Sequence, residues 1–190
     1  MQWVTRTRWL RAEHADLAAE HLLDTAGGLF ADRGVAAVSM ADVAQAAGCS
    51  RATLYRYFDG RDALRVAYVH REARRIGARV ADEVAAVDDP RDRLVEAMVA
   101  SLRLVRDDPT LAAWFSAGDV GATAVVAQSS GVIEALVAGL LGDGGDPAIR
   151  RRARWVVRVL VSLLARPEDD PDDERALLED FVAPVVAGPS

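Results

Sequence analysis

The chain has 190 residues, of which 51% are hydrophobic and 27% are charged. This composition is typical of a folded globular protein and excludes disordered and fibrous classes. The longest apolar stretch, residues 156–165, contains an arginine and is shorter than the ~20 residues that cross a membrane. The N-terminal residues lack the apolar core of a signal peptide, so we expect a cytoplasmic protein without a membrane segment.

The net charge of −6 is unevenly distributed along the chain. Residues 1–75 carry 11 arginines and 9 acidic residues, whereas residues 76–190 carry 12 arginines and 20 acidic residues. The positive charge is therefore concentrated in the N-terminal third of the chain. The single cysteine, Cys49, cannot form an internal disulfide, and the three histidines are far apart. We expect no metal and no other cofactor.

The first predicted helix contains apolar residues at helical spacing from Leu22 to Phe30, and Gly34 ends it. Two adjacent glycines, Gly27 and Gly28, interrupt this helix. Each glycine costs up to ~1 kcal/mol relative to alanine in a helix interior. We therefore expect another helix to pack closely over this position.

Two short helices follow. Ser39 and Asp42 form a variant of the capping box, which predicts a helix from about Met40 to Ala47. Gly48 stands where a left-handed residue ends a helix, and Ser50 can cap the next one. That third helix runs to about residue 58, and a fourth begins after the break at residues 59–60. A helix, a three-residue turn and a helix form a DNA-binding arrangement.

The helical pattern divides the residues of this motif between two faces. Four residues can pack together: Val43, Ala47, Leu54 and Phe58. Four others on the third helix point outwards: Arg51, Ala52, Tyr55 and Arg56. Arginine can donate two hydrogen bonds to guanine, alanine can contact the thymine methyl group, and hydroxyls can reach phosphates. An exposed helix pair of an ordinary bundle is the alternative interpretation.

The remainder of the chain also has a helical pattern. Short breaks interrupt it at residues 88–90, 107–109, 129–131, 142–147 and 167–173, and in two of them Asp precedes Pro, as at a helix start. No stretch alternates apolar and polar residues as a strand would. We therefore predict an all-α fold of about nine helices.

The segment SMADVAQAAGCSRATLYRYFDGRDAL resembles the DNA-binding domain of the TetR family of bacterial transcriptional regulators. The resemblance extends from about Leu22 to Leu64, a quarter of the chain. It implies an N-terminal three-helix helix-turn-helix domain and a larger helical ligand-binding and dimerisation domain. It further implies a homodimer that releases DNA when a small molecule binds. We expect an N-terminal arm at 1–16, the DNA-binding domain at 17–62 and the regulatory domain at 63–190.

Carried onto this sequence, the resemblance makes Arg51, Ala52 and Arg56 candidates for base contacts. It makes six residues candidates for phosphate contacts: Ser39, Ser50, Thr53, Tyr55, Tyr57 and Arg61. Tyr55 could serve either role. Arg61 stands where the family usually has lysine, which keeps the positive charge. The arginines of the N-terminal arm could enter the minor groove, and an extra helical turn or a disordered tail is the alternative.

The C-terminal part supplies weaker candidates. Residues that can line a ligand pocket are Met98, Leu102, Trp114 and Phe115, although a plain hydrophobic core would look the same. For the dimer interface we expect the helices at about 147–165 and 173–187, because the first is apolar around nearly its whole circumference. The interface residues expected there are Val156, Leu160, Leu164, Leu178 and Phe181.

Three other features are assigned structural roles. Cys49 is expected to pack in the turn, the arginines at 150–154 to be solvated or ion-paired, and the acidic run at 168–174 to precede a helix. No arrangement of nucleophile, base and phosphate loop points to an enzyme. The sequence predicts a repressor that a largely apolar effector releases from a palindromic operator. An activator or a ligand-independent DNA-binding regulator is the alternative.

Overall fold

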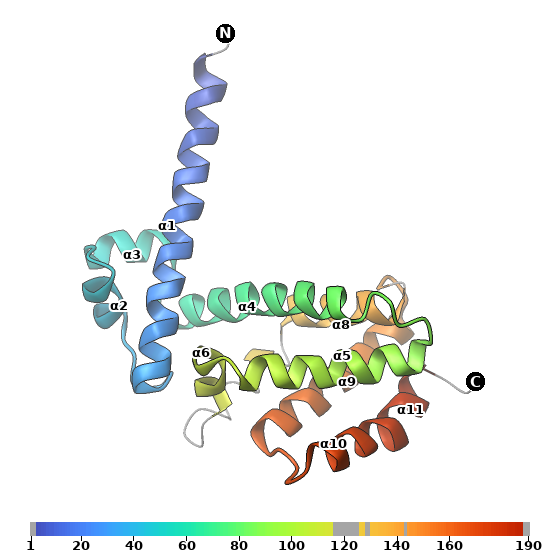
Figure 1. Cartoon of the computed structure of the whole chain (residues 1–190). Helices are drawn as coiled ribbons and strands as arrows, with labels where there is room; N and C mark the ends of the chain where they lie inside the picture. The colour runs from blue at the N-terminus through green and yellow to red at the C-terminus, as the bar shows by residue number, and fades with distance from the viewer. Residues whose placement is uncertain (1–2, 116–125, 128–129, 143, 188–190) are drawn as a thin grey trace. The chain divides into compact units, whose positions relative to one another are not determined.

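The computed structural model describes residues 3–115, 126–127, 130–142 and 144–187, with side chains for residues 15–186 within these ranges (Figure 1). Every regular element in these ranges is helical, which confirms the predicted all-α fold. None of these helices is long and apolar enough to cross a membrane. The chain divides into two compact units, Met1–Tyr68 and Val69–Ser190.

The N-terminal unit contains α1 (Trp3–Arg33), α2 (Met40–Ala46), α3 (Arg51–Tyr57) and the start of α4 (Arg61–Glu83). Helices α2 and α3 lie beside the C-terminal half of α1, and the N-terminal half of α1 extends beyond them (Figure 1). From Trp3 onwards, the backbone of the expected N-terminal arm therefore belongs to α1. Its side chains, including those of Arg6 and Arg11, lie outside the described residues.

The local signals at the ends of these helices are confirmed. Ser39 caps α2, its hydroxyl accepting from the backbone N–H of Asp42 while the Asp42 carboxylate accepts from the backbone N–H of Ser39. Gly34 and Gly48 have φ angles of +78° and +66°, the left-handed region in which glycine costs least. Ser50 caps α3, and its Oγ accepts from the backbone N–H of Thr53 at 3.0 Å.

The two glycines of α1 have different surroundings. A Cβ on Gly27 would lie 2.8 Å from Cε2 of Tyr68 in α4, so the expected close approach of a helix is confirmed there. The Tyr68 ring also packs edge-on against Phe30, with centroids 5.3 Å apart. Gly28 is exposed and a Cβ there would meet nothing within 4 Å. The expectation of close packing is therefore wrong for Gly28.

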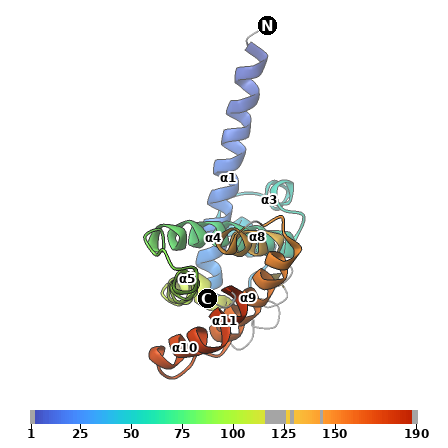
Figure 2. The ribbon, with the colours of Figure 1, turned by 90° about the vertical axis from the view of Figure 1, so that its right-hand side faces the viewer.

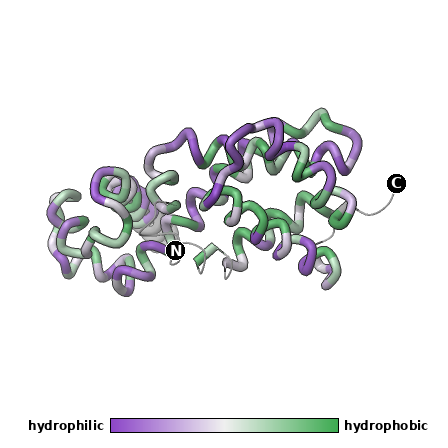
Figure 3. Tube along the Cα trace, turned by 90° about the horizontal axis from the view of Figure 1, so that it is seen from below, coloured by the Kyte–Doolittle hydropathy of each residue, from purple (hydrophilic) through white to green (hydrophobic). Residues whose placement is uncertain are grey.

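The C-terminal unit is a layered bundle (Figure 2). After α4 it contains α5 (Pro90–Arg106), α6 (Pro109–Ala112), the 3-10 turn η1 (Ala113–Phe115), α8 (Gly131–Leu141), α9 (Pro147–Ala165), α10 (Pro171–Leu177), the π-helical turn η2 (Leu178–Val182) and α11 (Ala183–Ala187). Helices α8 and α9 pack side by side (Figure 2). Hydrophobic and hydrophilic stretches are interspersed along the trace of this unit (Figure 3).

Aspartate followed by proline begins four helices of this unit rather than the two expected. The caps of α5, α6, α9 and α10 are Asp89, Asp108, Asp146 and Asp170. Each carboxylate accepts from a backbone N–H of the first turn, and proline at the first position has no N–H to satisfy. These caps fix where the helices around the core begin.

The C-terminal helices differ from the single helix expected at 173–187. Helix α10 begins two residues earlier, at Pro171, and the π-helical turn η2 separates it from α11. The acidic run does lie at the start of α10, as expected. Glu174 from this run is buried and forms a bidentate ion pair with Arg106 of α5, at 2.7 and 2.9 Å. This pair attaches α10 to α5.

Candidate nucleic-acid interface and cavity

Helix α3 presents the four outward-pointing residues that the sequence predicts. Arg51, Ala52, Tyr55 and Arg56 are exposed. On its other side, Leu54 is 0% exposed and packs in a core that includes Val43 of α2. A small buried core therefore holds a short helix whose opposite face carries two arginines and a tyrosine.

The serine hydroxyl groups at the starts of α2 and α3 take part in capping those helices. Ser50 Oγ contacts Thr53 Oγ1 at 2.9 Å in addition to its cap hydrogen bond. Ser39 forms a side-chain hydrogen bond with Asp42, and this bond, followed by the one from the Ser39 backbone, lowers the pKa of Asp42. Both serines are exposed, so their outer faces remain accessible to a phosphate.

Two of the candidate DNA-contacting arginines, Arg56 and Arg61, each contact another residue of the motif. The guanidinium of Arg56 lies 5.5 Å from the ring centroid of half-buried Tyr57, a cation–π distance. Arg61 is exposed, and its Nη1 donates to the carbonyl of Ala36 at 3.5 Å. The motif thus has three exposed arginines on α3 and at the start of α4. Cys49 is half-buried in the turn, and its N–H donates to Ala44 O at 2.9 Å.

The C-terminal unit contains a partly open cavity of about 660 Å³. Its walls come from α4, α5, α6, η1, α8 and α9. Of the residues that the sequence suggested for a pocket, Met98, Trp114 and Phe115 line this cavity. Leu102 does not line it and packs instead in the main core with Leu94 and other residues of α5, α9 and η2.

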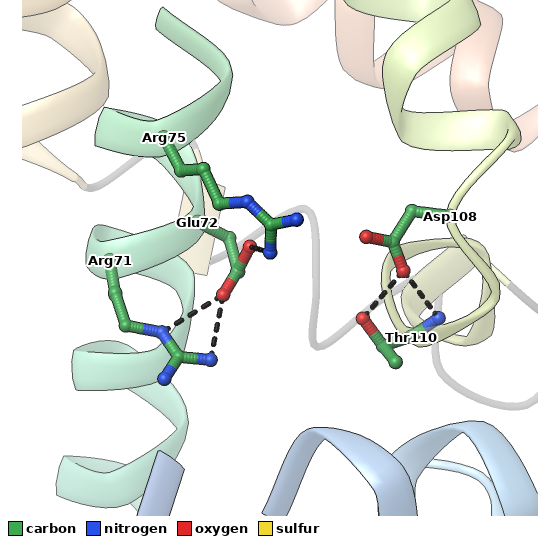
Figure 4. A network of polar contacts seen from close by, with 5 residues as sticks. All are labelled: Arg71, Glu72, Arg75, Asp108 and Thr110. Carbon is green, nitrogen blue, oxygen red and sulfur yellow. Dashed lines mark hydrogen bonds and ion pairs between the residues drawn. The ribbon is translucent and has the colours of Figure 1, made fainter. Parts of the chain in front are cut away.

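In the part of the chain that the structure describes, three polar side chains reach the cavity wall: Glu72, Arg93 and Ser101. Glu72 is buried and accepts hydrogen bonds from Nε of Arg71 at 2.9 Å and from Nη1 of Arg75 at 3.4 Å (Figure 4). The figure also shows Asp108, which accepts from the backbone N–H and the hydroxyl of Thr110. The sequence analysis missed Glu72, because a charged residue on an amphipathic helix gives no sign that it is buried.

The five residues expected at a dimer interface lie in different environments. Val156 and Leu178 are 1% and 0% exposed within the chain itself, so they support the surface rather than form it. Leu160 and Leu164 are partly buried and line the cavity. Phe181 is 71% exposed. Two other apolar residues, Trp155 at 47% and Val185 at 66%, are also exposed, and we call Trp155, Phe181 and Val185 the exposed apolar face.

The arginines at the start of α9 are solvated or ion-paired, as expected. Arg150, Arg151 and Arg152 are exposed, and Arg154 pairs with Glu134 of α8 at 3.2 Å. Among the described residues, no group of histidine, cysteine and acidic side chains could hold a metal ion.

Comparison with known proteins identifies the family. Residues 22–68 match the family described as bacterial regulatory proteins, tetR family. An uncharacterized HTH-type transcriptional regulator of Mycobacterium tuberculosis strain H37Rv is 50% identical over 183 residues, which cover 95% of this chain and 91% of the relative. The chain belongs to the TetR family. It is therefore a DNA-binding transcriptional regulator with a helix-turn-helix at its N-terminus.

Solved structures of TetR-family proteins share this fold. The TetR family repressor AlkX from Dietzia sp., implicated in biodegradation of n-alkanes, has 25% identity and a TM-score of 0.67, covering 88% of this chain and 94% of AlkX. RolR in complex with resorcinol has 18% identity and a TM-score of 0.72, covering 93% of this chain and 91% of RolR. At that lower identity the likeness to RolR shows the fold alone.

Proposed function

We propose that this TetR-family regulator is a homodimeric cytoplasmic repressor that leaves a palindromic operator when a small, largely apolar effector enters its cavity. The observation that carries the proposal is that one chain contains both an exposed cationic α3 and a large, mostly apolar cavity. AlkX is a repressor by its description, and RolR binds resorcinol in its crystal structure. The likeness to AlkX supports repression, and the RolR complex is an example of a protein of this fold that holds a small ligand.

In this proposal α3 enters the major groove and reads bases through Arg51, Ala52 and Arg56. Tyr55, which is 50% exposed on the same helix, contacts a base or a phosphate. Five other residues contact phosphates: Ser39, Ser50, Thr53, Tyr57 and Arg61. Arg61 is assigned to a phosphate because its hydrogen bond to Ala36 O holds its guanidinium near the backbone of the motif.

The test of these roles is selection of binding sites from random duplex DNA, followed by titrations at several salt concentrations with the full chain. Arg51→Ala or Arg56→Ala should weaken binding by about 1–3 kcal/mol and relax the preference at one base pair. Arg61→Ala should weaken binding to all sequences and lower the salt slope by about one. An Arg61→Ala protein with altered sequence preference and an unchanged salt slope would contradict the assignment.

The homodimer is proposed to form through the exposed apolar face, with Val156 and Leu178 as buried support. Two subunits are needed because a palindromic operator places two recognition helices ~34–36 Å apart, or a multiple of that distance. Phe181→Asp puts an unpaired charge in this face and should yield monomers in light scattering. Ala78→Asp, at an exposed position of α4, adds the same charge elsewhere and should leave the dimer intact. A folded, dimeric Phe181→Asp protein would rule out this interface.

Repression is tested by transcription from a promoter that carries the selected operator. Adding the protein should lower transcript levels, and adding an effector should restore them. A rise in transcript on adding the protein alone would show an activator that uses the same DNA contacts.

A further inference from the structure

The lining of the cavity extends furthest along α4. Its lining residues along α4 and the turn after it run from Val69 to Ala85, which at 1.5 Å per residue is a length of about 24 Å. A volume of about 660 Å³ spread over this length gives a mean cross-section of about 28 Å². A space of this shape fits one extended chain better than a compact ring system.

The walls are almost entirely apolar. Of the 30 described residues that line the cavity, 27 are hydrophobic residues or glycines. Of the three polar ones, Ser101 has its hydroxyl engaged, because it donates to Ala97 O at 2.7 Å. Among the described residues of the wall, this leaves Glu72 and Arg93 to set the charge of a ligand, and they lie toward opposite ends of the cavity.

Arg93 lies at the open end. Exposed lining residues gather at the C-terminal ends of α4 and α8, where they include Ala81, Ala85 and Gly142. Arg93 lies near the start of α5 at this end; its backbone N–H donates to Asp89 O at 2.9 Å, and its guanidinium forms no hydrogen bond or ion pair with any described residue. The carboxylate of Asp89 interacts electrostatically with Arg93, but its hydrogen bonds are made to the backbone N–H groups of Arg91 and Asp92, which it caps at the start of α5. A guanidinium with unused donors at the mouth of an apolar channel is suited to a carboxylate.

The described residues at the other end offer no unpaired carboxylate for a cation. Glu72 lies there near Leu111 and Trp114, and two arginines already neutralise its carboxylate. A positively charged ligand would have to displace one of them. The apolar residues around Glu72 suit the end of a hydrocarbon tail.

On the basis of the effector cavity proposed above, we infer that the effector is a long, unbranched carboxylic acid. Its carboxylate binds Arg93 and its tail lies along α4 toward Trp114. With carbon–carbon bonds of ~1.5 Å and angles near 111°, an extended chain advances about 1.25 Å per carbon, so a cavity of about 24 Å accommodates roughly 14–18 carbons and a head group.

The head group is tested with four probes on the full-length protein, each below its aggregation concentration: hexadecanoate, 1-hexadecanol, hexadecyltrimethylammonium and octanoate. Calorimetry and tryptophan emission measure binding. Hexadecanoate should bind most tightly, and Arg93→Gln should weaken its binding about 10-fold or more while leaving 1-hexadecanol unaffected. Arg91→Gln removes the same charge two residues away on the same helix, at a position that does not line the cavity, and should bind as the unaltered protein does.

The tail is tested with Ala73→Leu, which narrows the cavity about 18 Å from Ala85 along α4. This variant should prefer acids about four carbons shorter and should retain the dependence on Arg93. Ala78→Leu adds the same side chain on the exposed side of α4 and should not change the preferred chain length.

DNA release from the selected operator is measured separately, by fluorescence anisotropy. Binding of hexadecanoate that depends on Arg93 supports the ligand class even if DNA is not released, in which case the proposed effector response fails alone. The inference is overturned if Arg93→Gln binds hexadecanoate unchanged. It is also overturned if a compact aromatic compound releases DNA while no long-chain acid binds, an outcome that leaves the proposed repressor standing.

Discussion

The N-terminal unit places most of its candidate contacts on α3, a helix of 7 residues, whereas the C-terminal unit builds its cavity from helices spread over residues 69–164. Helix α3 is specified by signals within a few residues of it: the cap at Ser50, the turn glycine Gly48 and the buried Leu54. The cavity depends on where helices that are distant in sequence leave a space.

This contrast has a consequence for stability. The core of the N-terminal unit is small, so each fully buried side chain contributes a large share of its stability. The walls of the cavity already face a space, so truncating a wall residue removes fewer packing contacts. The two units should therefore respond differently to the same substitution.

The largest difference is expected between Leu54→Ala and Leu160→Ala. Leu54 is 0% exposed, and its truncation should destabilise the N-terminal unit by about 2–5 kcal/mol. Leu160 is partly buried at the cavity wall, and its truncation should cost less than about 2 kcal/mol. Urea unfolding with amide hydrogen exchange in α3 and α9 measures both. Equal losses would show that the cavity is tightly filled by side chains after all.

A second comparison lies within the C-terminal unit. The carboxylate of Glu174 is 8% exposed and forms two hydrogen bonds with Arg106, so Glu174→Gln should lower the free energy of unfolding by about 1.5–3 kcal/mol. Glu96 pairs with Arg175 but is 43% exposed, and Glu96→Gln should cost about 1 kcal/mol or less. Thermal unfolding of the two variants measures the difference. A larger loss for Glu96→Gln would contradict the assigned role of burial.

The adjacent glycines of α1 provide a matched pair in the N-terminal unit. Gly27→Ala puts a methyl group 2.8 Å from the Tyr68 ring and should destabilise the unit by about 1–3 kcal/mol. Gly28→Ala meets nothing within 4 Å and should stabilise it by up to ~1 kcal/mol, because alanine favours the helix. Chemical denaturation measures both changes. If both variants were stabilised, Tyr68 would have to move aside without cost.

The same contrast explains how much the sequence could predict. The capping box at Ser39 and Asp42, the left-handed Gly48 and the outward residues of α3 follow from spacing within one or two helical turns, and the structure has them as expected. The start of α5 after Asp89 was predictable for the same reason. These features need no knowledge of distant segments.

The features that the sequence could not predict depend on distant segments. Periodicity places Leu102 and Met98 on apolar sides of α5, and both lie in the same buried core, but only the packing of distant helices decides that Met98 also lines the cavity and Leu102 does not. Val156 and Leu178 have the residue types of an interface, yet the chain buries them itself. The π-helical turn at residues 178–182 has no local signal that we recognise.

The smallest expected effect is the pH dependence of the cap of α2. The side-chain hydrogen bond with Ser39 and the one from its backbone N–H hold the pKa of Asp42 below its ordinary value. The stabilisation is therefore complete above the unfolded pKa of about 3.9 and is lost as the pH falls through the lower folded pKa. Asp42→Asn should reduce stability by a constant amount above about pH 5, and this difference from the unaltered protein should shrink toward pH 3. Asp32→Asn removes the same charge from the exposed surface of α1 and serves as the control in the same unfolding series. If the Asp42→Asn difference stayed constant down to pH 3, the carboxylate would not be the group that holds the cap.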